Sequence, residues 1–407
     1  MRYDGDMATF VATDRLTDLI AEELEDLTAL RRDLHSHPEL GYQEHRTSGI
    51  VQEQLERVGI AHVGGLAGGT GVLGHLPGRA DRAIGLRADM DALPISERTG
   101  LPYASTRDGL MHACGHDGHT TILIGVSRVL ARLSKEMELP RPVTLTFQPA
   151  EEGGGGGKRM VDDGCLDGSV IGPPVENMFG LHGWPQLTLG EVGTRPGPLL
   201  AAADTFEITI EGTGSHAAFP HLSADPIVAG SQLVSALQSV VSRNVGPLDS
   251  AVVSVTQFHS GTAHNIIPGR TTVSGTVRTL KPEVQATVRK RLAELADGIA
   301  ASHGCAARFE YREGYPVTSN DHEMVNVFNT VARQTIDPEQ VLDIEHPVMG
   351  GEDFSFYGQR VPACFFVVGL CPPDQESMPS LHQPTFDFND DAIALGIELF
   401  CGLALRD

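Results

Sequence analysis

The stretch VTLTFQPAEE, residues 143–152, passes from a short apolar run to two adjacent carboxylates. VTLTF has the length and composition of a buried β-strand. AIGL (83–86) and NMFGL (177–181) are also short apolar runs followed by charged or imidazole side chains, and ACFFVV (363–368) is a further strand candidate. Residues 120–133, between AIGL and VTLTF, have the apolar spacing of a helix. Strands that alternate with helices indicate a mostly parallel α/β sheet, which gathers its ligands at the carboxyl ends of its strands.

The middle of the chain has a different pattern, flanked by proline and glycine on both sides. The predicted order is strand, helix, two strands, helix, strand, at residues 205–212, 227–241, 251–258, 270–279, 283–303 and 306–313. That order is typical of the ferredoxin-like split βαβ sandwich. We therefore predict an α/β catalytic domain formed by residues 1–197 and 315–407. An α+β domain at residues 198–314 is inserted into it.

Composition narrows the functional class. The chain has 407 residues, of which 41% are hydrophobic and 20% charged, as expected for a globular enzyme. Its formal net charge of -23 argues against nucleic acid and anionic membranes as partners. No apolar run reaches the roughly 18 residues that suggest a membrane span, and the acidic N-terminal stretch lacks the features of a signal peptide. The six cysteines are widely spread, so we expect reduced thiols and a cytoplasmic location.

The stretch MHACGHDGH, residues 111–119, contains one cysteine and three histidines. Cys114 can be a nucleophile, a metal ligand or a buried structural thiol. Its separation of two residues from His116 disfavours a thiol–imidazole catalytic pair, whose members are usually distant in sequence. A turn at Gly115 would instead let thiolate and imidazole converge on one metal, and zinc-like ions accept such mixed ligands. The spacing alone leaves the three possibilities open.

Other polar residues carry a similar ambiguity. Glu151 and Glu152 are either two carboxylates with different roles or a solvated acidic loop. His182 and His382, each taken alone, have the pattern of ordinary hydrogen-bonded histidines. We expect His35, His37 and His119 to support a site rather than bind metal, and these three residues are therefore not placed among the ligands. The glycines at 153–157 do not form a phosphate loop, because the residues that this motif requires on either side are missing.

Nine motifs in order give the chain a recognisable pattern: RRDLHSHPELGYQE, RADMDALP, MHACGHDGH, QPAEEGGGG, GLHGWP, GTGSHAAFPH, GTAHNIIPGR, MGGEDFSFY and LHQPTFDFND. The pattern resembles the M20 metallopeptidase and amidohydrolase family, in the branch of hippurate hydrolases, N-acyl-amino-acid amidohydrolases and plant auxin-conjugate hydrolases. The resemblance implies a zinc-peptidase-like catalytic domain with a lid and dimerisation domain inserted in it. It also implies two divalent metal ions, which can be Mn, Zn, Co or Ni. The implied metal ligands are Cys114, His116, Glu152, His182 and His382.

The same resemblance assigns roles to further residues. Glu151 is implied as the general acid/base that takes a proton from a metal-activated water and passes it to the leaving amine. Asp91 is implied as the carboxylate that orients the site. Two positions depart from the wider family, because Cys114 stands where a bridging aspartate is usual and Asp89 where a histidine ligand is usual. His116 would take over that histidine's role.

The inserted domain is implied to complete the site. His216 matches a residue that stabilises the oxyanion, and Asn265 and Arg278 match residues that bind the substrate's carboxylate. Because these residues lie on another domain, closure of the lid or a partner subunit must bring them to the substrate. The resemblance also implies a homodimer formed through the inserted domain.

We therefore predict a metal-dependent amidohydrolase whose small-molecule substrate is an N-acyl or N-aroyl amino acid. Two alternatives within the family are a carboxypeptidase or dipeptidase that acts on true peptides, and a deacetylase for an N-acetyl-diamino acid. A non-catalytic binding protein on the same fold is an alternative of another class. The presence of Glu151 argues against it, because a binding protein needs no general base.

Overall fold

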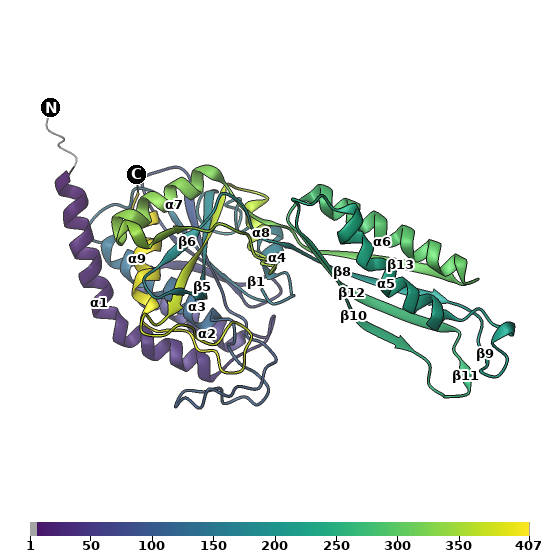
Figure 1. Ribbon diagram of the computed structural model, residues 1–407. Coiled ribbons are helices and arrows are strands. Elements are labelled where there is room, and N and C mark those ends of the chain that lie inside the picture. The colour runs from purple at the N-terminus through teal and green to yellow at the C-terminus, as the bar shows by residue number, and fades with distance from the viewer. Residues whose placement is uncertain (1–5, 407) are drawn as a thin grey trace. The chain divides into compact units, whose positions relative to one another are not determined.

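The computed structural model describes residues 6–406, and side chains from residue 15 onward. The described chain forms two compact units (Figure 1). Unit 1 takes the described residues of Met1–Leu199, Ser319–Glu345 and Asp353–Asp407. Unit 2 consists of Leu200–Thr318 and His346–Glu352. Strands β7 (Gly197–Leu200) and β14 (Thr318–Asn320) pair with each other where the chain leaves and re-enters unit 1.

Unit 1 is built on an eight-stranded sheet. In spatial order its strands are β1 (Ala61–Leu66), β2 (Gly71–Leu76), β4 (Val143–Gln148), β3 (Ala83–Asp89), β5 (Val175–Thr188), β16 (Ala363–Cys371), β6 (Val192–Thr194) and β15 (Val341–Asp343). The four central strands, β4, β3, β5 and β16, are parallel to their neighbours within this group. Every residue of β3, β4 and β16 is buried, as expected for parallel strands covered on both faces. The predicted mostly parallel α/β sheet is confirmed.

The helices of unit 1 are α1 (Asp6–Ser36), α2 (His45–Val58), α3 (His116–Leu133), α4 (Gly156–Asp162), α7 (His322–Thr335), α8 (Ser355–Gly358) and α9 (Ala392–Ala404), with a 3₁₀ turn η2 (Pro338–Gln340). Helix α2 ends at Gly59, which adopts a left-handed conformation (φ 78°). Helix α3 packs against α1, α2 and α9, and all of its residues except Arg132 are buried. It begins four residues before the predicted start, because Gly115 (φ 86°) turns the chain directly into the helix at His116.

Unit 2 has a four-stranded antiparallel sheet with the order β10-β12-β8-β13. Its elements along the chain are β8 (Ala202–Glu211), β9 (Ser215–His216), η1 (Pro220–Leu222), α5 (Pro226–Asn244), β10 (Ala251–Ser260), β11 (Ile266–Ile267), β12 (Arg270–Thr279), α6 (Pro282–Ser302) and β13 (Ala306–Tyr315). Buried and half-buried residues alternate along nearly all of β12, so one face of the sheet packs on α5 and α6 while the other is more open. The predicted order of strands and helices is present.

Between residues 6 and 406, no helix combines the length and the apolar content that spanning a membrane requires.

Candidate metal centre

Strands β3 and β4 of unit 1 carry the candidate site at their carboxyl ends, and β5 carries it at the same level in the middle of its length. Strand β3 ends at Asp89, and Asp89 is in register with Gln148, the last residue of β4. The loop after β4 contributes Glu151 and Glu152, and β5 carries His182. This arrangement is the general rule for parallel α/β sheets, where ligands bind beyond the carboxyl ends of the strands.

Two groups of potential ligands share one thiol. The ligand atoms of Cys114, His116 and His182 all lie within 4.8 Å of one another, and so do those of Cys114, Glu152 and His382. Cys114 belongs to both groups, so its sulfur lies between two sets of nitrogen and oxygen donors. Each group has the three protein ligands that a catalytic zinc-like site uses. The geometry therefore suits a pair of divalent ions with the thiolate between them.

The hydrogen bonds leave the metal-binding atoms of the histidines available. His182 Nδ1 donates to the carbonyl of Gly183 at 2.8 Å, which leaves the Nε2 lone pair facing Cys114 Sγ at 3.4 Å. His116 Nδ1 donates to Asp91 Oδ1 at 3.3 Å. His116 Nε2 is buried and makes no hydrogen bond to any described residue, although Asp89 Oδ2 is 3.6 Å away, whereas Glu152 Oε1 lies 3.0 Å from His382 Nε2. An orphaned buried polar atom costs about 1–3 kcal/mol, and a bound cation would relieve that cost here.

The electrostatics show which protons a metal must displace. Burial raises the pKa of the Cys114 thiol well above its ordinary value, and the Glu152 and Glu151 carboxylates raise it further. Burial alone lowers the pKa of His116, but Asp89 and Asp91 outweigh burial and raise that pKa to about 10. At neutral pH, both groups therefore hold a proton in the metal-free protein.

We expect metal affinity to rise steeply with pH. Because binding must release protons from both Cys114 and His116 below pH 10, the association constant should increase by up to about 100-fold per pH unit. Competition with a fluorescent chelator at pH 6, 7 and 8 measures this slope. The variant Cys114→Asp is the control, because it lacks the thiol proton and should show a shallower slope. An affinity that stays constant or falls as the pH rises would contradict the assignment.

Asp91 fixes the backbone that presents both glutamates. Its Oδ1 accepts from the Glu151 backbone N–H at 3.0 Å, and its Oδ2 accepts from the Glu152 N–H at 3.0 Å. Since Oδ1 also accepts from His116, one carboxylate orients a candidate metal ligand and both glutamates. Asp91 is 1% exposed, so this arrangement is shielded from water. Asp91 thus holds the backbone of both glutamates and the ring of His116 through one buried carboxylate.

Sequence reasoning missed Glu44, which supports the same loop from the other side. Glu44 Oε1 accepts from the Ala150 N–H at 2.8 Å, while Oε2 accepts from the Thr70 hydroxyl at 2.8 Å. Ala150 adopts a left-handed φ of 53°, which is unfavourable for a residue with a Cβ atom. The Glu44 contact therefore holds a strained residue immediately before Glu151. The only sequence signal was the position of Glu44 at the end of RRDLHSHPELGYQE.

Asp353, the second residue that sequence reasoning missed, lies beside Glu151. Its backbone N–H is 3.4 Å from Glu151 Oε1, and its own Oδ2 accepts from the Gly157 N–H at 2.8 Å. Asp353 Oδ1 accepts from Arg87 at 3.0 Å, and Arg87 also donates to Asp89 at 2.7 Å.

Glu151 is 6% exposed and lies in the same cluster as His116 and Glu152. The candidate acid/base is thus held next to both groups of ligands.

Residues 85–406 match the model of peptidase family M20/M25/M40. The chain belongs to this family. It is 40% identical to N-acetylcysteine deacetylase of Bacillus subtilis over 386 residues, which cover 93% of this chain and 96% of that protein. It is 36% identical to hippurate hydrolase of Campylobacter jejuni over 393 residues, which cover 96% and 99%.

A solved structure agrees with these matches. The crystal structure of the Bacillus subtilis YXEP protein, described as a dinuclear metal binding peptidase from the M20 family, aligns with a TM-score of 0.81 and 35% identity. The alignment covers 95% of this M20 chain and 98% of that chain. The predicted family and the predicted class of metal-dependent amidohydrolase are confirmed.

The three histidines that were expected to support the M20 centre have partners other than a metal. His119 Nδ1 donates to Asp89 at 2.7 Å, and its Nε2 accepts from the Gly183 N–H at 2.8 Å, so neither nitrogen is left for a metal. His35 lies against Asp117 at 2.8 Å, one residue after His116. His37, one residue after the end of α1, contacts the Asp33 carbonyl in the last turn of that helix at 2.8 Å. His119 thus bridges β3 and β5, and His35 supports the first turn of α3.

His382 is the most exposed of the candidate ligands. Its side chain is 52% exposed, and its Nε2 lies 3.0 Å from Glu152 Oε1. The backbone of His382 has a left-handed φ of 64° and donates to the Ala113 carbonyl at 2.7 Å. That bond ties the loop of His382 to the loop of Cys114, although the two are far apart in sequence.

The candidate substrate-binding residues of unit 2 fall into two places. His216 in β9 pairs with Ile266 in β11, and the Asn265 carbonyl accepts from the Ala217 N–H at 2.9 Å, so His216 and Asn265 are neighbours. Strand β12 begins at Arg270, three residues after β11, and therefore starts near this pair. Arg278 is eight residues further along β12, a distance of about 26 Å in an extended strand. Its guanidinium bonds Thr276 and the Val277 carbonyl. Unit 2 does not bring Arg278 together with the other two.

Proposed function

We propose that this protein hydrolyses the amide bond of small N-acyl or N-aroyl amino acids. The observation that carries the proposal is the shared-thiol pair of ligand groups with the Glu151 carboxylate beside it. Relatives named as N-acetylcysteine deacetylase and hippurate hydrolase match over nearly the whole chain. Both names describe the removal of an acyl group from an amino acid, which is the same bond type.

The metal ligands in this proposal are Cys114, His116, Glu152, His182 and His382. Two divalent ions bound there would polarise the scissile carbonyl and activate the attacking water. The two groups differ, because one offers a thiolate with two imidazoles and the other a thiolate with one imidazole and one carboxylate. Zn, Co, Ni and Mn all accept such donors, and the group with two imidazoles is the softer one.

Glu151 performs the proton transfers. Its carboxylate receives the proton of the attacking water and delivers it to the nitrogen of the departing amine, which is a poor leaving group until protonated. The Glu151 backbone N–H donates to the Asp91 carboxylate, and the Asp353 backbone N–H donates to the Glu151 carboxylate. Adjacent Glu152 keeps its charge as a ligand, so the two glutamates do different work.

Unit 2 supplies the groups that recognise the substrate. In our proposal His216 stabilises the oxyanion, while Asn265 and Arg278 bind the carboxylate. Because Arg278 is about 26 Å along β12 from the end near His216, one copy of unit 2 cannot place all three on one small substrate. We propose a homodimer formed through unit 2. In it, one copy supplies His216 and Asn265 to a given site, and the other copy supplies Arg278.

The exposed apolar residues support this dimer. Among the described residues, every exposed large hydrophobic side chain except Met137 belongs to unit 2. Several surround β9, β11 and the start of α5, including Phe219, Leu222 and Ile266, which are 52%, 68% and 55% exposed. Contiguous apolar surface of this kind marks protein–protein contact sites.

We expect the double variant Leu222→Glu, Ile266→Glu to be monomeric. Placing two carboxylates in an apolar interface imposes a desolvation cost of several kcal/mol, which is enough to shift a dimer to monomer at micromolar concentration. Light scattering coupled to size-exclusion chromatography measures the mass. Leu248→Glu is the matched control, since Leu248 is 100% exposed but lies in the loop between α5 and β10. A double variant that keeps the wild-type mass would rule out this surface.

The cysteines agree with the proposed cytoplasmic location. All six are free in the structure, and the five other than Cys305 are buried. A reducing compartment keeps such thiols unpaired.

A substrate panel tests the proposed function. Chelator-stripped protein is assayed for amine release from hippurate, N-acetyl-amino acids, an N-acetyl-diamino acid and dipeptides, with and without Mn²⁺ or Zn²⁺. Hydrolysis of N-acyl amino acids that returns only with metal supports the proposal. Preference for dipeptides or for the diamino acid would favour one of those alternative substrates. If folded, metal-loaded protein released no amine from any compound, a non-catalytic binding protein would become the better reading.

A further inference from the structure

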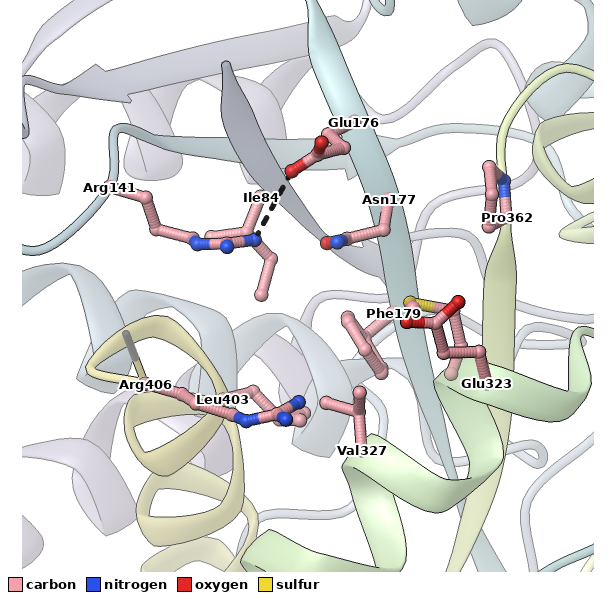
Figure 2. A pocket seen from close by; sticks show the side chains of 11 residues that line it. Ile84, Arg141, Glu176, Asn177, Phe179, Glu323, Val327, Pro362, Leu403 and Arg406 are labelled. Atoms are coloured by element: carbon pink, nitrogen blue, oxygen red, sulfur yellow. Dashed lines mark ion pairs between the residues drawn. The ribbon is translucent and has the colours of Figure 1, made fainter. Parts of the chain in front are cut away.

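A cavity of about 340 Å³ lies in unit 1 at the amino ends of the central strands. It is bordered by Ile84 near the start of β3, by Asn177 near the start of β5 and by Pro362 just before β16 (Figure 2). His182 is five residues further along β5 than Asn177, a distance of about 17 Å in an extended strand. The cavity is therefore separate from the metal centre and at the other end of the same sheet. Its volume is within the range of small-molecule sites.

Asn177 is an unusual residue for its position. It is 8% exposed, and its Oδ1 is buried without a hydrogen-bond partner among the described residues. Asparagine is depleted in strands, and an orphaned buried oxygen destabilises the fold. Figure 2 shows the Asn177 amide directed into the cavity. An aliphatic side chain would be more stable there, so the amide is suited to a ligand that donates a hydrogen bond.

The charged residues of the cavity include one cation and one anion that are not paired. Arg141 lies 3.6 Å from Glu176, so these two charges largely offset each other. Arg406 and Glu323 also line the cavity, and neither makes an ion pair with another described residue. Both side chains are exposed to solvent and are therefore open to a charged ligand. The cavity thus offers one site for a carboxylate and one for an ammonium group.

The rest of the lining is apolar. Phe179, Val327 and Leu403 face the cavity from β5, α7 and α9 (Figure 2). Met324 adds a flexible thioether that adapts to different shapes. Phe179 and Leu403 are only 0% and 2% exposed, so they lie behind the surface of the cavity, and the half-buried Val327 is the apolar side chain that a ligand would meet.

We propose that this cavity binds a free α-amino acid with an apolar side chain, in its zwitterionic form. Arg406 grips the carboxylate through its guanidinium, and the ammonium group donates to Glu323 and to Asn177 Oδ1. The apolar side chain rests on Val327, behind which Phe179 and Leu403 are buried. Such an amino acid is also the kind of product that the proposed reaction releases, but the assignment rests on the cavity alone and stands without that reaction.

Calorimetry on the full-length protein tests the ligand class. The protein is stripped of metal, and the probes are L-leucine, L-methionine and L-phenylalanine, each compared with its N-acetyl and carboxamide derivatives. We expect saturable binding of at least one free amino acid, and binding at least about 10-fold weaker once either charge is removed. Absence of binding by all free amino acids overturns the proposal. Equal binding of an N-acetyl derivative overturns the zwitterion assignment.

Variants locate the binding. Asn177→Leu should abolish binding, and it should raise the Tm of the ligand-free protein by about 2 °C because it removes the orphaned oxygen. Arg406→Ala should weaken binding at least about 10-fold without changing the Tm, and it carries the test alone if the Asn177 variant does not fold. Arg243→Ala is the matched control, because Arg243 is an exposed arginine at the end of α5. Binding that is unchanged in both cavity variants would assign the ligand to another surface and refute the proposal.

Discussion

The variant Glu151→Gln is expected to lower kcat for N-acyl amino acid hydrolysis by about 10²–10⁴-fold, the usual contribution of a general acid/base. The amide of glutamine can neither accept the proton of water nor protonate the amine. It can still accept the Asp353 N–H, and the backbone bond from Glu151 to Asp91 is unaffected by the substitution. The loss should therefore appear in kcat while the fold and the metal content are preserved.

Metal analysis beside kinetics separates this role from that of its neighbour. Glu151→Gln should retain two ions per chain, because Glu151 is absent from both groups of ligands that share Cys114. Glu152→Gln is the matched comparison, since the same substitution one residue later removes a proposed ligand and should lower the metal content. Full turnover in Glu151→Gln would remove Glu151 from the mechanism. Loss of metal from that variant would make Glu151 a ligand instead.

The parts of this site that could be predicted are those that depend on short patterns. A buried apolar run followed at once by carboxylates, as at 143–152, predicts both a strand and the end at which its ligands gather. The structure has β4 at Val143–Gln148, with Glu151 and Glu152 just beyond it. The order of strands and helices in unit 2 likewise followed from the spacing of apolar residues, which alternate with polar residues in strands and recur every three or four residues in helices.

The parts that could not be predicted depend on contacts between distant segments. Glu44 and Asp353 are ordinary acidic residues in the sequence, and their roles arise only because the fold brings them to Ala150 and Glu151. The left-handed conformations of Ala150 and His382 leave no local signal, because glycine is the residue that usually marks such positions. The orphaned Asn177 is equally invisible until β5 is placed beside its neighbours.

The residues of unit 2 show a different limit. Matching motifs places His216, Asn265 and Arg278 in one functional list, but it carries no information about distance. Strand geometry supplies that information, because an extended chain advances about 3.3 Å per residue and β12 keeps Arg278 away from the other two. The motifs imply a partner subunit, and the geometry of β12 adds a physical reason why one copy of unit 2 is not enough.

Substitutions of Cys114 by alanine and by aspartate are expected to differ strongly in metal affinity and turnover. Cys114→Ala removes a donor from both ligand groups at once. Removing a residue that only hydrogen-bonds to a metal ligand typically lowers metal affinity by roughly 10–100-fold, so the loss of the ligand itself should lower it further. Cys114→Asp restores a negatively charged donor that can lie between two ions. We expect it to retain metal-dependent turnover, reduced by about 10–100-fold. Replacing a soft thiolate by a hard carboxylate should also shift the preferred metal from Zn towards Mn.

The same pair of variants decides whether Cys114 is a nucleophile. His182 Nε2 lies 3.4 Å from its sulfur, so a potential base is present. However, burial and the nearby Glu152 and Glu151 raise the pKa of the thiol, whereas a reactive cysteine has an electropositive environment that lowers it. Turnover in Cys114→Asp, measured as amine release with and without added metal, would exclude a covalent acyl-enzyme on sulfur. If both variants were inactive while still binding two ions, the thiol would have a chemical role that a carboxylate cannot fill, and the metal-bridging assignment would fail.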